Sequence, residues 1–247
     1  MQKISKSDLL RLYLRSFFIQ TGWSYERMIA FGFAWALSPL TKKLFSSGGE
    51  RADFLKRQLL NFNANPYLAG YSLGAVVRLE EERIPGQQIA RFKDSLRGPL
   101  GALGDRLIWQ SFLPASLTLG IILTYRFGVW GALSFWLIFN LYQVYQRARG
   151  LTKGYSLGLG VSSDLVGGHI QKVTRWSGRI GAFLLGLLFA GKLYHAAIRP
   201  SQPGNAILLP LFILLSYGAF KKNLNPHYTL LLLIALFLVI KAMVFLV

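Results

Sequence analysis

Five long stretches with little or no charge follow Arg106, and this feature limits the possible fold more than any other. They are residues 107–125, 127–146, 180–198, 200–220 and 223–247. Each is close to the roughly 20 residues that a helix needs to cross a bilayer. Because lipid offers no partner to a free backbone amide, such runs cross as helices. We therefore predict an all-α integral membrane protein, not a soluble enzyme, with about five transmembrane helices.

The composition agrees with this prediction. Only 15% of the 247 residues are charged and 53% are hydrophobic, whereas about a quarter of an ordinary globular domain is charged. The charge is also one-sided, because 28 Lys and Arg stand against 10 Asp and Glu, for a net charge of +18. Nucleic-acid binders carry such an excess on a solvated face, but here the bases flank apolar runs. We therefore interpret them as topology signals and contacts with anionic membrane lipid, and we expect no nucleic-acid partner.

The distribution of the bases predicts the orientation. If the stretches cross the membrane in turn with the N-terminus inside, the inside segments hold 16 bases before Leu107, six from Arg147 to Arg179, and the pair Lys221 and Lys222. Cytoplasmic loops carry such an excess of Lys and Arg. The N-terminal residues also lack the apolar core of a secretory signal peptide. We therefore expect a retained, cytoplasmic N-terminus and an external C-terminus.

Residues 1–106 contain no full span. We predict that they form a cytoplasmic or interfacial helical region with re-entrant or broken helices, ahead of the transmembrane region 107–247. Four apolar residues near the start lie at helical spacing, with Arg11 and Arg15 on another side: Leu10, Leu14, Phe17 and Phe18. This pattern is typical of an interfacial or partner-packing helix, and it is equally compatible with packing in a core. Residues 28–40 are apolar but too short to span, which favours a re-entrant or buried helix.

The helix boundaries in this region carry further signals. Asn65 followed by Pro66 joins a good N-cap to proline at the first helical position, so a helix should begin there. It should include the acidic residues 80–82 and end at Pro85-Gly86. The string RGPLGALGDRLIW, residues 97–109, holds glycines and a proline just before the first apolar run. We predict flexible or broken backbone there, which membranes tolerate where it lines a polar cavity, as in many transporters.

No catalytic centre emerges from the titratable residues. The histidines His169, His195 and His227 are scattered and lack the spacing of a metal site or an activated nucleophile, and the chain has no cysteine. We predict no metal site and no cofactor. The glycine string GYSLGLG, residues 154–160, follows no predicted strand, so it favours close helix packing over a phosphate cradle.

A set of polar and aromatic residues around the predicted break suits a small polar solute such as a sugar: Asn63, Asn65, Glu80, Glu81, Asp105, Trp109 and Gln110. Carboxylates and amides can pair with adjacent hydroxyls, and an aromatic ring can carry the apolar face of a pyranose. Other interpretations stay open. Asn65 and Asp105 are also typical N-caps, the glutamates can pair with Arg78 or Arg83 on a wet helix face, and Trp109 can be an interfacial anchor.

Several strings, taken in order, resemble the enzyme IID component of the mannose, fructose and sorbose family of the bacterial phosphotransferase system. The resemblance is nearly full length. Its strings are LRSFFIQTGWSYERMIAFGFAWALSPLTKKLF (14–45), FNANPYLAGYSLGAVVRLEEE (62–82), RGPLGALGDRLIW (97–109), FNLYQVYQRARGLTKGYSLG (139–158), QKVTRWSGRIG (171–181) and NPHY (225–228).

The resemblance implies a membrane subunit without a catalytic centre of its own. Such a subunit works with the integral enzyme IIC component, in a hetero-oligomer of several copies, to move a hexose through the bacterial inner membrane. Phosphate passes through histidines of the enzyme IIA and IIB partners. The family's substrate pathway involves membrane-embedded hairpins of IIC and IID, which implies sugar-facing roles for Asn63, Asn65, Glu80, Glu81 and Asp105.

Two places depart from the family pattern. Ala64 and Asn65 stand where the family commonly has threonine and histidine, and Arg106 follows the Gly-Asp pair where proline or serine is common. Both departures lie beside the predicted site. They motivate an alternative hypothesis, in which the chain is a transport-inactive membrane interaction or regulatory protein derived from the same family.

Overall fold

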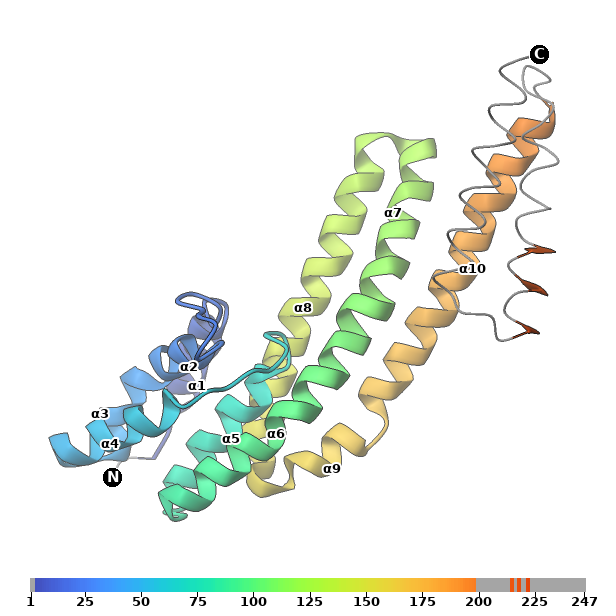
Figure 1. The fold of residues 1–247 in the computed structure, drawn as a ribbon. Coiled ribbons are helices and arrows are strands. Elements are labelled where there is room, and N and C mark those ends of the chain that lie inside the picture. Colours follow the sequence, from blue (N-terminus) through green and yellow to red (C-terminus); the bar gives the residue numbers. More distant parts are fainter. Residues whose placement is uncertain (1–2, 199–213, 216, 219–220, 223–247) are drawn as a thin grey trace. The chain divides into compact units, whose positions relative to one another are not determined.

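The computed structural model describes residues 3–198 and, beyond them, 214–215, 217–218 and 221–222 (Figure 1). This part of the chain is built of helices and holds no strand, so the all-α prediction is confirmed for it. By its internal contacts the chain divides into two units, residues 1–184 and 185–247. The predicted span 223–247 and almost all of the predicted span 200–220 lie outside the described residues.

Short helices make up the first 60 residues: α1 (Lys6–Ser16), α2 (Ala30–Leu37), the 3-10 turn η1 (Ser38–Leu40), α3 (Thr41–Leu44) and α4 (Gly48–Gln58). Capping boxes begin α1 and α4, where the side chains of Ser5 and Ser47 accept hydrogen bonds from the amides of Asp8 and Glu50. Such reciprocal caps satisfy the free amides of a first turn. The sequence therefore determines both starts by placing a serine three residues before an acid.

The apolar segment 28–40 is helical from Ala30 onward and largely buried, in agreement with the sequence prediction, although Phe31 and Trp35 are 51% and 38% exposed. The apolar face of α1 differs, because Leu10, Leu14 and Phe18 are 57%, 55% and 59% exposed. Core packing is therefore the wrong interpretation of this face. An interfacial or partner-packing helix is the interpretation that agrees with the exposure.

The longer helices follow: α5 (Ala69–Glu81), α6 (Gly86–Leu107), the π-helical turn η2 (Ile108–Phe112), α7 (Leu113–Phe127), α8 (Val129–Leu157), the 3-10 turn η3 (Gly158–Gly160), α9 (Val161–Val166) and α10 (His169–Ile198). Regular helix in α5 begins at Ala69, three residues after Pro66, and ends at Glu81, four residues before Pro85. Both ends are close to the predicted limits. α8 contains the apolar stretch 127–146 from Val129 onward, α10 contains the stretch 180–198, and both helices extend beyond these stretches through polar residues.

α6, η2 and α7 form one continuous helical stretch from Gly86 to Phe127 (Figure 1). Among the described residues it is the one helix long and apolar enough to cross a membrane, with a mean hydropathy of 1.5 in its apolar window. The predicted break in residues 97–109 is wrong, because α6 continues through Pro99 and the irregular turn comes at Ile108–Phe112. Proline removes one helical hydrogen bond, and the regular turns on both sides hold the backbone.

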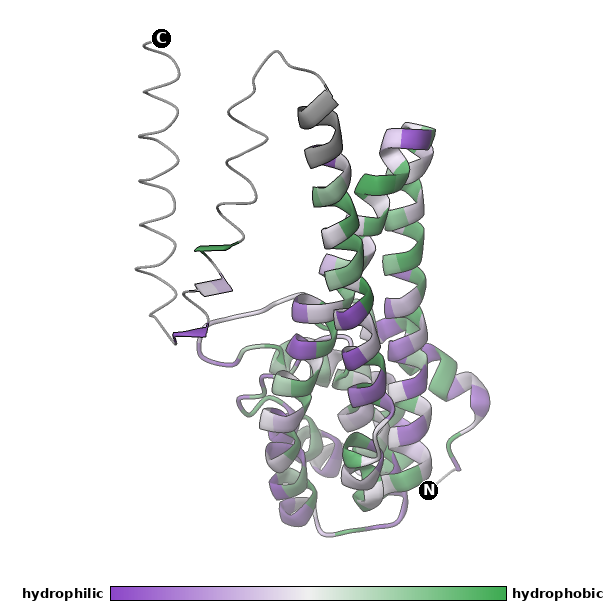
Figure 2. Cartoon of the chain, turned by 90° about the vertical axis from the view of Figure 1, so that its right-hand side faces the viewer, coloured by the Kyte–Doolittle hydropathy of each residue, from purple (hydrophilic) through white to green (hydrophobic). Residues whose placement is uncertain are grey.

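α7 and α8 pack against each other as an antiparallel hairpin (Figure 1). Large apolar side chains, including Trp130, Trp136 and Leu141, are exposed on it. Figure 2 shows hydrophobic residues along the shaft of the hairpin and polar residues gathered toward the end that meets the other helices. Monomeric soluble proteins rarely expose a contiguous apolar surface of this length, so the hairpin fits a lipid environment.

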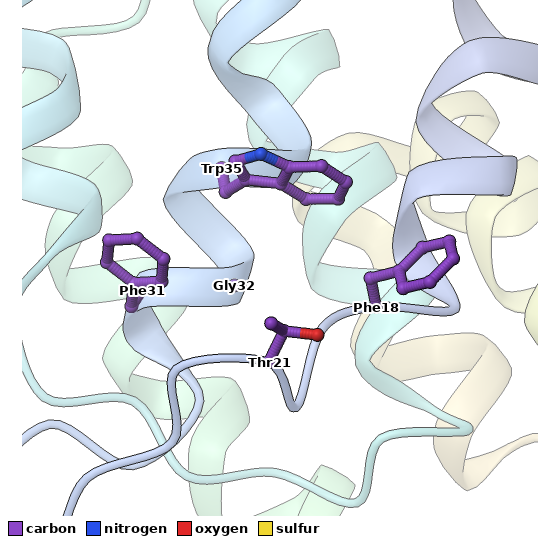
Figure 3. A pocket seen from close by; sticks show the side chains of 5 residues that line it. All are labelled: Phe18, Thr21, Phe31, Gly32 and Trp35. Carbon is purple, nitrogen blue, oxygen red and sulfur yellow. The ribbon is translucent and has the colours of Figure 1, made fainter.

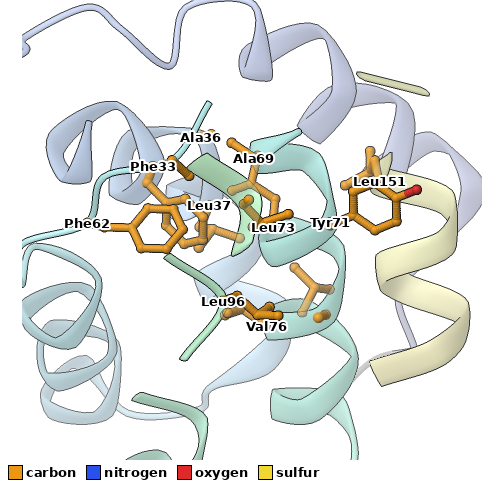
Figure 4. Close-up of a cluster of buried hydrophobic side chains, with 14 of the residues drawn as sticks. Phe33, Ala36, Leu37, Phe62, Ala69, Tyr71, Leu73, Val76, Leu96 and Leu151 are labelled. Carbon is orange, nitrogen blue, oxygen red and sulfur yellow. The ribbon is translucent and has the colours of Figure 1, made fainter. Parts of the chain in front are cut away.

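The core lies where α2, α5, α6 and α8 meet, with Phe33, Tyr71 and Leu151 among its buried side chains (Figure 4). Glycines bring α5 and α8 together. A Cβ on Gly74 would lie 2.3 Å from the carbonyl oxygen of Leu151, and one on Gly154 would lie 2.2 Å from that of Tyr71. The prediction of close helix packing for the glycine string is thus confirmed at Gly154. This crossing fixes the position of α5 and of the turn that precedes it.

Candidate functional site

Two of the predicted site residues meet across 40 positions of sequence. The Asn65 side-chain amide donates a hydrogen bond of 2.9 Å to Oδ1 of Asp105. Asn65 is 3% exposed and Asp105 lies on the surface, so the hydrogen bond joins a buried amide to an exposed carboxylate. The other Asp105 oxygen accepts no hydrogen bond from the described residues, and a carboxylate oxygen of this kind can accept one from a hydroxyl group.

The local backbone explains how Asn65 is held. Its Oδ1 accepts a hydrogen bond of 3.1 Å from the amide of Tyr67, and its carbonyl oxygen accepts bonds of 3.0 Å from the amides of Leu68 and Ala69. Asn65 therefore caps the turn that leads into α5, whereas the N-cap of α5 itself is Leu68, three residues later than the N-cap interpretation predicted. For Asp105 that interpretation is wrong, because Asp105 lies inside α6.

Gly104 makes the meeting of the two segments possible. A Cβ at this position would lie 2.2 Å from the Cβ of Asn65, far inside van der Waals contact. Only glycine lets α6 approach the Asn65 turn this closely. The pair of Gly104 and Asp105 thus has a joint role, in which the glycine supplies the space and the aspartate the hydrogen-bonding partner.

Aromatic rings and one buried cation border the pair. The rings of Tyr67 and Trp109 meet edge to face with centroids 5.8 Å apart, and Trp109 is 44% exposed. The guanidinium of Arg147 lies 4.9 Å from the Tyr67 ring and donates hydrogen bonds to the carbonyl oxygens of Pro66 (3.0 Å) and Ser16 (2.7 Å). Arg147 therefore ties α8 to the Asn65 turn and to the end of α1.

Glu80 and Glu81 lie at the opposite end of α5, about 20 Å from its start at 1.5 Å per residue. Glu80 is 5% exposed and pairs with Arg57 at 3.0 Å. Glu81 accepts hydrogen bonds from the amide of Ile4 (2.7 Å) and the hydroxyl of Tyr155 (2.6 Å). The predicted pairing of these two with Arg78 or Arg83 is wrong, because the helix turns them inward, and Arg78 pairs instead with Glu82.

The predicted site residues thus form two groups. Asn65 and Asp105 are hydrogen-bonded and Trp109 contacts the neighbouring Tyr67, while Gln110 and Asn63 are exposed and adjoin this group in sequence. Glu80 and Glu81 form the second group, with carboxylates held by protein partners, and their role as sugar ligands stays a prediction. Burial raises the pKa of Glu80, and Arg57 opposes that rise.

Sequence reasoning overlooked three residues that hold or border the first group: Gly104, Tyr67 and Arg147. All three stand in the strings that carry the family resemblance. Gly104 could have been found from the rule that a glycine in a helix marks a close approach. Arg147 was interpreted only as a topology signal at the end of an apolar stretch, because nothing local shows that it reaches the carbonyl oxygens of other segments.

The model of one protein family matches residues 3–197. This family is described as the PTS system mannose/fructose/sorbose family IID component. The match covers most of the chain and includes every residue of the site described above.

Individual proteins give the same result. The chain is 34% identical to the mannose-specific EIID component of the PTS system in Escherichia coli (strain K12), over 76% of this chain and 68% of that protein. It is 31% identical to the fructose permease IID component of Bacillus subtilis (strain 168), and 32% identical to the sorbose-specific EIID component of Klebsiella pneumoniae. Each of these two matches covers 76% of this chain and 70% of the relative.

Solved structures are similar over nearly the whole chain. One is a chain in the cryoEM structure of the mannose transporter ManYZ in complex with microcin E492, with a TM-score of 0.62 and 26% sequence identity over 98% of this chain and 97% of that one. A second, titled only as a membrane protein, has a TM-score of 0.72 and 27% identity over the same shares.

Proposed function

The chain belongs to the IID components of the mannose/fructose/sorbose family of the phosphotransferase system, a family of membrane proteins of sugar transport, and from this premise we propose that it translocates a hexose together with an enzyme IIC subunit. In this proposal the enzyme IIA and IIB phosphocarriers phosphorylate the hexose as it reaches the cytoplasm. The chain supplies part of the path and no catalytic group. The two membrane subunits assemble in several copies.

The observation that carries the proposal is the Asn65–Asp105 pair beside Trp109. Asp105 and Trp109 lie four positions apart, about one helical turn, where α6 passes into the apolar stretch. A carboxylate oxygen without a partner in the described part of the chain and a half-exposed indole together match the hydroxyl and apolar faces of a sugar ring. Gln110 and Asn63, which adjoin Trp109 and the Asn65 turn in sequence, carry exposed amides.

We further propose the arrangement of the chain in the inner membrane of a bacterium. Residues 1–106 form the cytoplasmic or interfacial region with re-entrant segments, and residues 107–247 form the transmembrane region of about five helices. The N-terminus is cytoplasmic and the C-terminus external. This arrangement is supported by the Lys and Arg residues, most of which lie in the segments that it places on the cytoplasmic side, where membrane proteins carry an excess of these residues.

An Asp105→Asn variant tests the site. Asparagine keeps the shape and can still accept the hydrogen bond from Asn65, but it loses the negative charge that accepts strongly from a hydroxyl. We expect the rate at which cells accumulate phosphorylated hexose to fall by roughly ten- to a hundredfold, as for the loss of one charged hydrogen bond. Glu82→Gln is the matched control, because Glu82 is exposed and follows the end of α5, away from the pair. Uptake by Asp105→Asn equal to that of Glu82→Gln would contradict the assignment.

A second candidate function is regulatory binding without transport, and the Asn65 side chain favours it. Its oxygen and its amide group are both engaged by the protein, with Tyr67 and Asp105, so less of the pair remains for a sugar. This candidate predicts binding to a soluble IIA or IIB partner without hexose uptake, and gain of uptake in Asn65→His. Arg106→Pro is the weaker test, because Arg106 lies inside α6, where proline breaks a hydrogen bond.

A further inference from the structure

An apolar cavity lies between α2 and the segment that follows α1. It has a volume of about 320 Å³ and is lined by Phe18, Thr21, Phe31, Gly32 and Trp35. Figure 3 shows the rings of Phe18, Phe31 and Trp35 around its opening, with Thr21 along one edge. None of the predicted sugar-site residues lines it. The cavity is therefore distinct from the proposed sugar site, and its apolar walls favour a hydrocarbon ligand.

The cavity shares Phe18 with an exposed apolar surface that begins on α1. Leu10 and Leu14 lie on that helix, and Phe17, Phe18 and Trp23 follow it, all of them exposed. An apolar stripe on a short basic helix is typical of a helix that lies in the membrane interface. The family is one of membrane proteins, so the acyl region of a bilayer is available to cover this face.

Two arginines stand beside the cavity. The guanidinium of Arg15 lies 3.6 Å from the centre of the Trp35 ring and donates a hydrogen bond of 2.6 Å to the Trp35 carbonyl oxygen. Arg11 lies one helical turn before Arg15. Within the described part of the chain neither arginine forms an ion pair with an acidic side chain, since the acid of α1, Asp8, pairs with Lys43.

The two like charges disfavour each other at this spacing. Burial, and then the charge of Arg11, lower the pKa of Arg15, in keeping with a cation that lacks a counter-ion. An anion placed beside Arg11 and Arg15 would relieve the repulsion. The ligand that fits is therefore anionic at one end and a hydrocarbon at the other.

We propose that this cavity binds one anionic phospholipid, with an acyl chain among Phe18, Phe31 and Trp35 and the headgroup phosphate at Arg11 and Arg15. A helix of another protein would have to supply both an apolar edge and carboxylates in register, whereas an anionic lipid carries both parts on one molecule. The inner leaflet supplies such lipids at the cytoplasmic surface. The site is separate from the proposed sugar site and does not depend on it.

The test measures how brominated lipids quench tryptophan fluorescence of the full-length chain in nanodiscs, together with the IIC subunit if the two co-purify. Two sets of discs have the same composition of phosphatidylglycerol and phosphatidylcholine, with bromine on the chains of one lipid or of the other. The difference between the wild type and Trp35→Phe isolates the signal of Trp35. We expect this signal to be quenched several-fold more by brominated phosphatidylglycerol.

Charge removal gives the second arm. In Arg11→Gln/Arg15→Gln the phosphatidylglycerol content needed for half-maximal quenching should rise by roughly tenfold or more, because each base near an anionic headgroup contributes a factor of about five. Arg83→Gln/Arg91→Gln removes the same charge at exposed positions away from the cavity and should leave this content unchanged. The circular dichroism spectrum of each variant shows whether its helices are intact.

Three results would overturn the proposal. Equal quenching by the two brominated lipids would show general lipid contact without a site. No quenching by either would show that protein covers the cavity. Displacement of the brominated phosphatidylglycerol by added inorganic phosphate would show a site for a free anion and not for a lipid.

Discussion

At the scale of single residues, Arg147 shows how a buried charge organises the site. It is 6% exposed, and in the described part of the chain it forms no ion pair with a carboxylate. Its guanidinium instead satisfies the carbonyl oxygens of Ser16 and Pro66 and lies against the rings of Phe17 and Tyr67. A buried polar group that loses its partner costs more than the hydrogen bond itself contributes.

Arg147→Met should therefore destabilise the protein. Methionine fills much of the space but removes the Arg147 donor from the Pro66 carbonyl oxygen and leaves that of Ser16 with the 3.3 Å bond from the Ile19 amide, at about 1–3 kcal/mol for a buried group that loses its partner. We expect the melting temperature in detergent to fall by several degrees, measured by size-exclusion chromatography after heating. Arg91→Met is the control, because Arg91 is exposed on α6. Equal melting temperatures for the two variants would show that Arg147 does not hold the Asn65 turn.

Asp8 gives a prediction in pH. Burial alone would raise the pKa of its carboxyl, but hydrogen bonds from Lys43 and Ser5 outweigh this effect and hold the pKa at about 2. Because the folded pKa lies below the unfolded value of about 4, the stabilisation is complete above roughly pH 4 and is lost as the pH falls toward 2.

Asp8→Asn should therefore melt at a lower temperature than the wild type at pH 7, and the two melting temperatures should converge near pH 2. Asp53→Asn should match the wild type throughout, because Asp53 is 69% exposed and its pair with Lys56 spans 3.7 Å. A gap between Asp8→Asn and the wild type that stays constant from pH 7 to pH 2 would contradict the role given to the Lys43 and Ser5 contacts.

At the scale of helices, the crossing of α5 and α8 is the contact that positions the site. Gly154→Ala places a Cβ against the Tyr71 carbonyl oxygen and has to push the helices apart, at a cost of about 1–3 kcal/mol or more. Gly101→Ala meets no atom within 4 Å and should be neutral or stabilising. Thermal melts of the two variants compare the costs directly. A Gly154→Ala melt like that of Gly101→Ala would mean that the close crossing does not limit stability.

The sequence was sufficient for what depends on local pattern. The apolar stretches 107–125 and 127–146 fall in helices apart from Gly128, and the segment 28–40 is helical from Ala30 onward and largely buried because most of its residues are apolar. Contacts between distant segments could not be derived in the same way. The Asn65–Asp105 bond spans 40 positions, and Glu80 pairs with Arg57 rather than with an arginine nearer in the sequence because tertiary packing decides which face of α5 is buried.

The predicted backbone break shows the remaining limit. Glycine and proline in residues 97–109 were interpreted as breakers because each disfavours an isolated helix. In the structure α6 continues through these residues to Leu107, since Gly104 serves the close approach of Asn65, and the irregular turn at Ile108–Phe112 includes only the last two residues of the string. Tertiary packing decides whether a glycine breaks a helix or allows a close approach, and this packing cannot be derived from a single sequence.

At the scale of the whole molecule, family membership and fold agree on a membrane subunit of a sugar phosphotransferase system. The α7–α8 hairpin exposes apolar surface suited to lipid. The polar pair near Trp109 lies at the start of the apolar helix, which is where the proposed function places the sugar.

The most direct test is the accumulation of phosphorylated hexose in cells that lack their own mannose-family system and make this chain with matching IIC, IIA and IIB proteins. Radiolabelled mannose, fructose and sorbose are each supplied, and the intracellular label is separated into free and phosphorylated sugar. The account predicts that at least one hexose accumulates in phosphorylated form, and that omitting this chain abolishes the accumulation. Equal accumulation of phosphorylated hexose with and without this chain would contradict it.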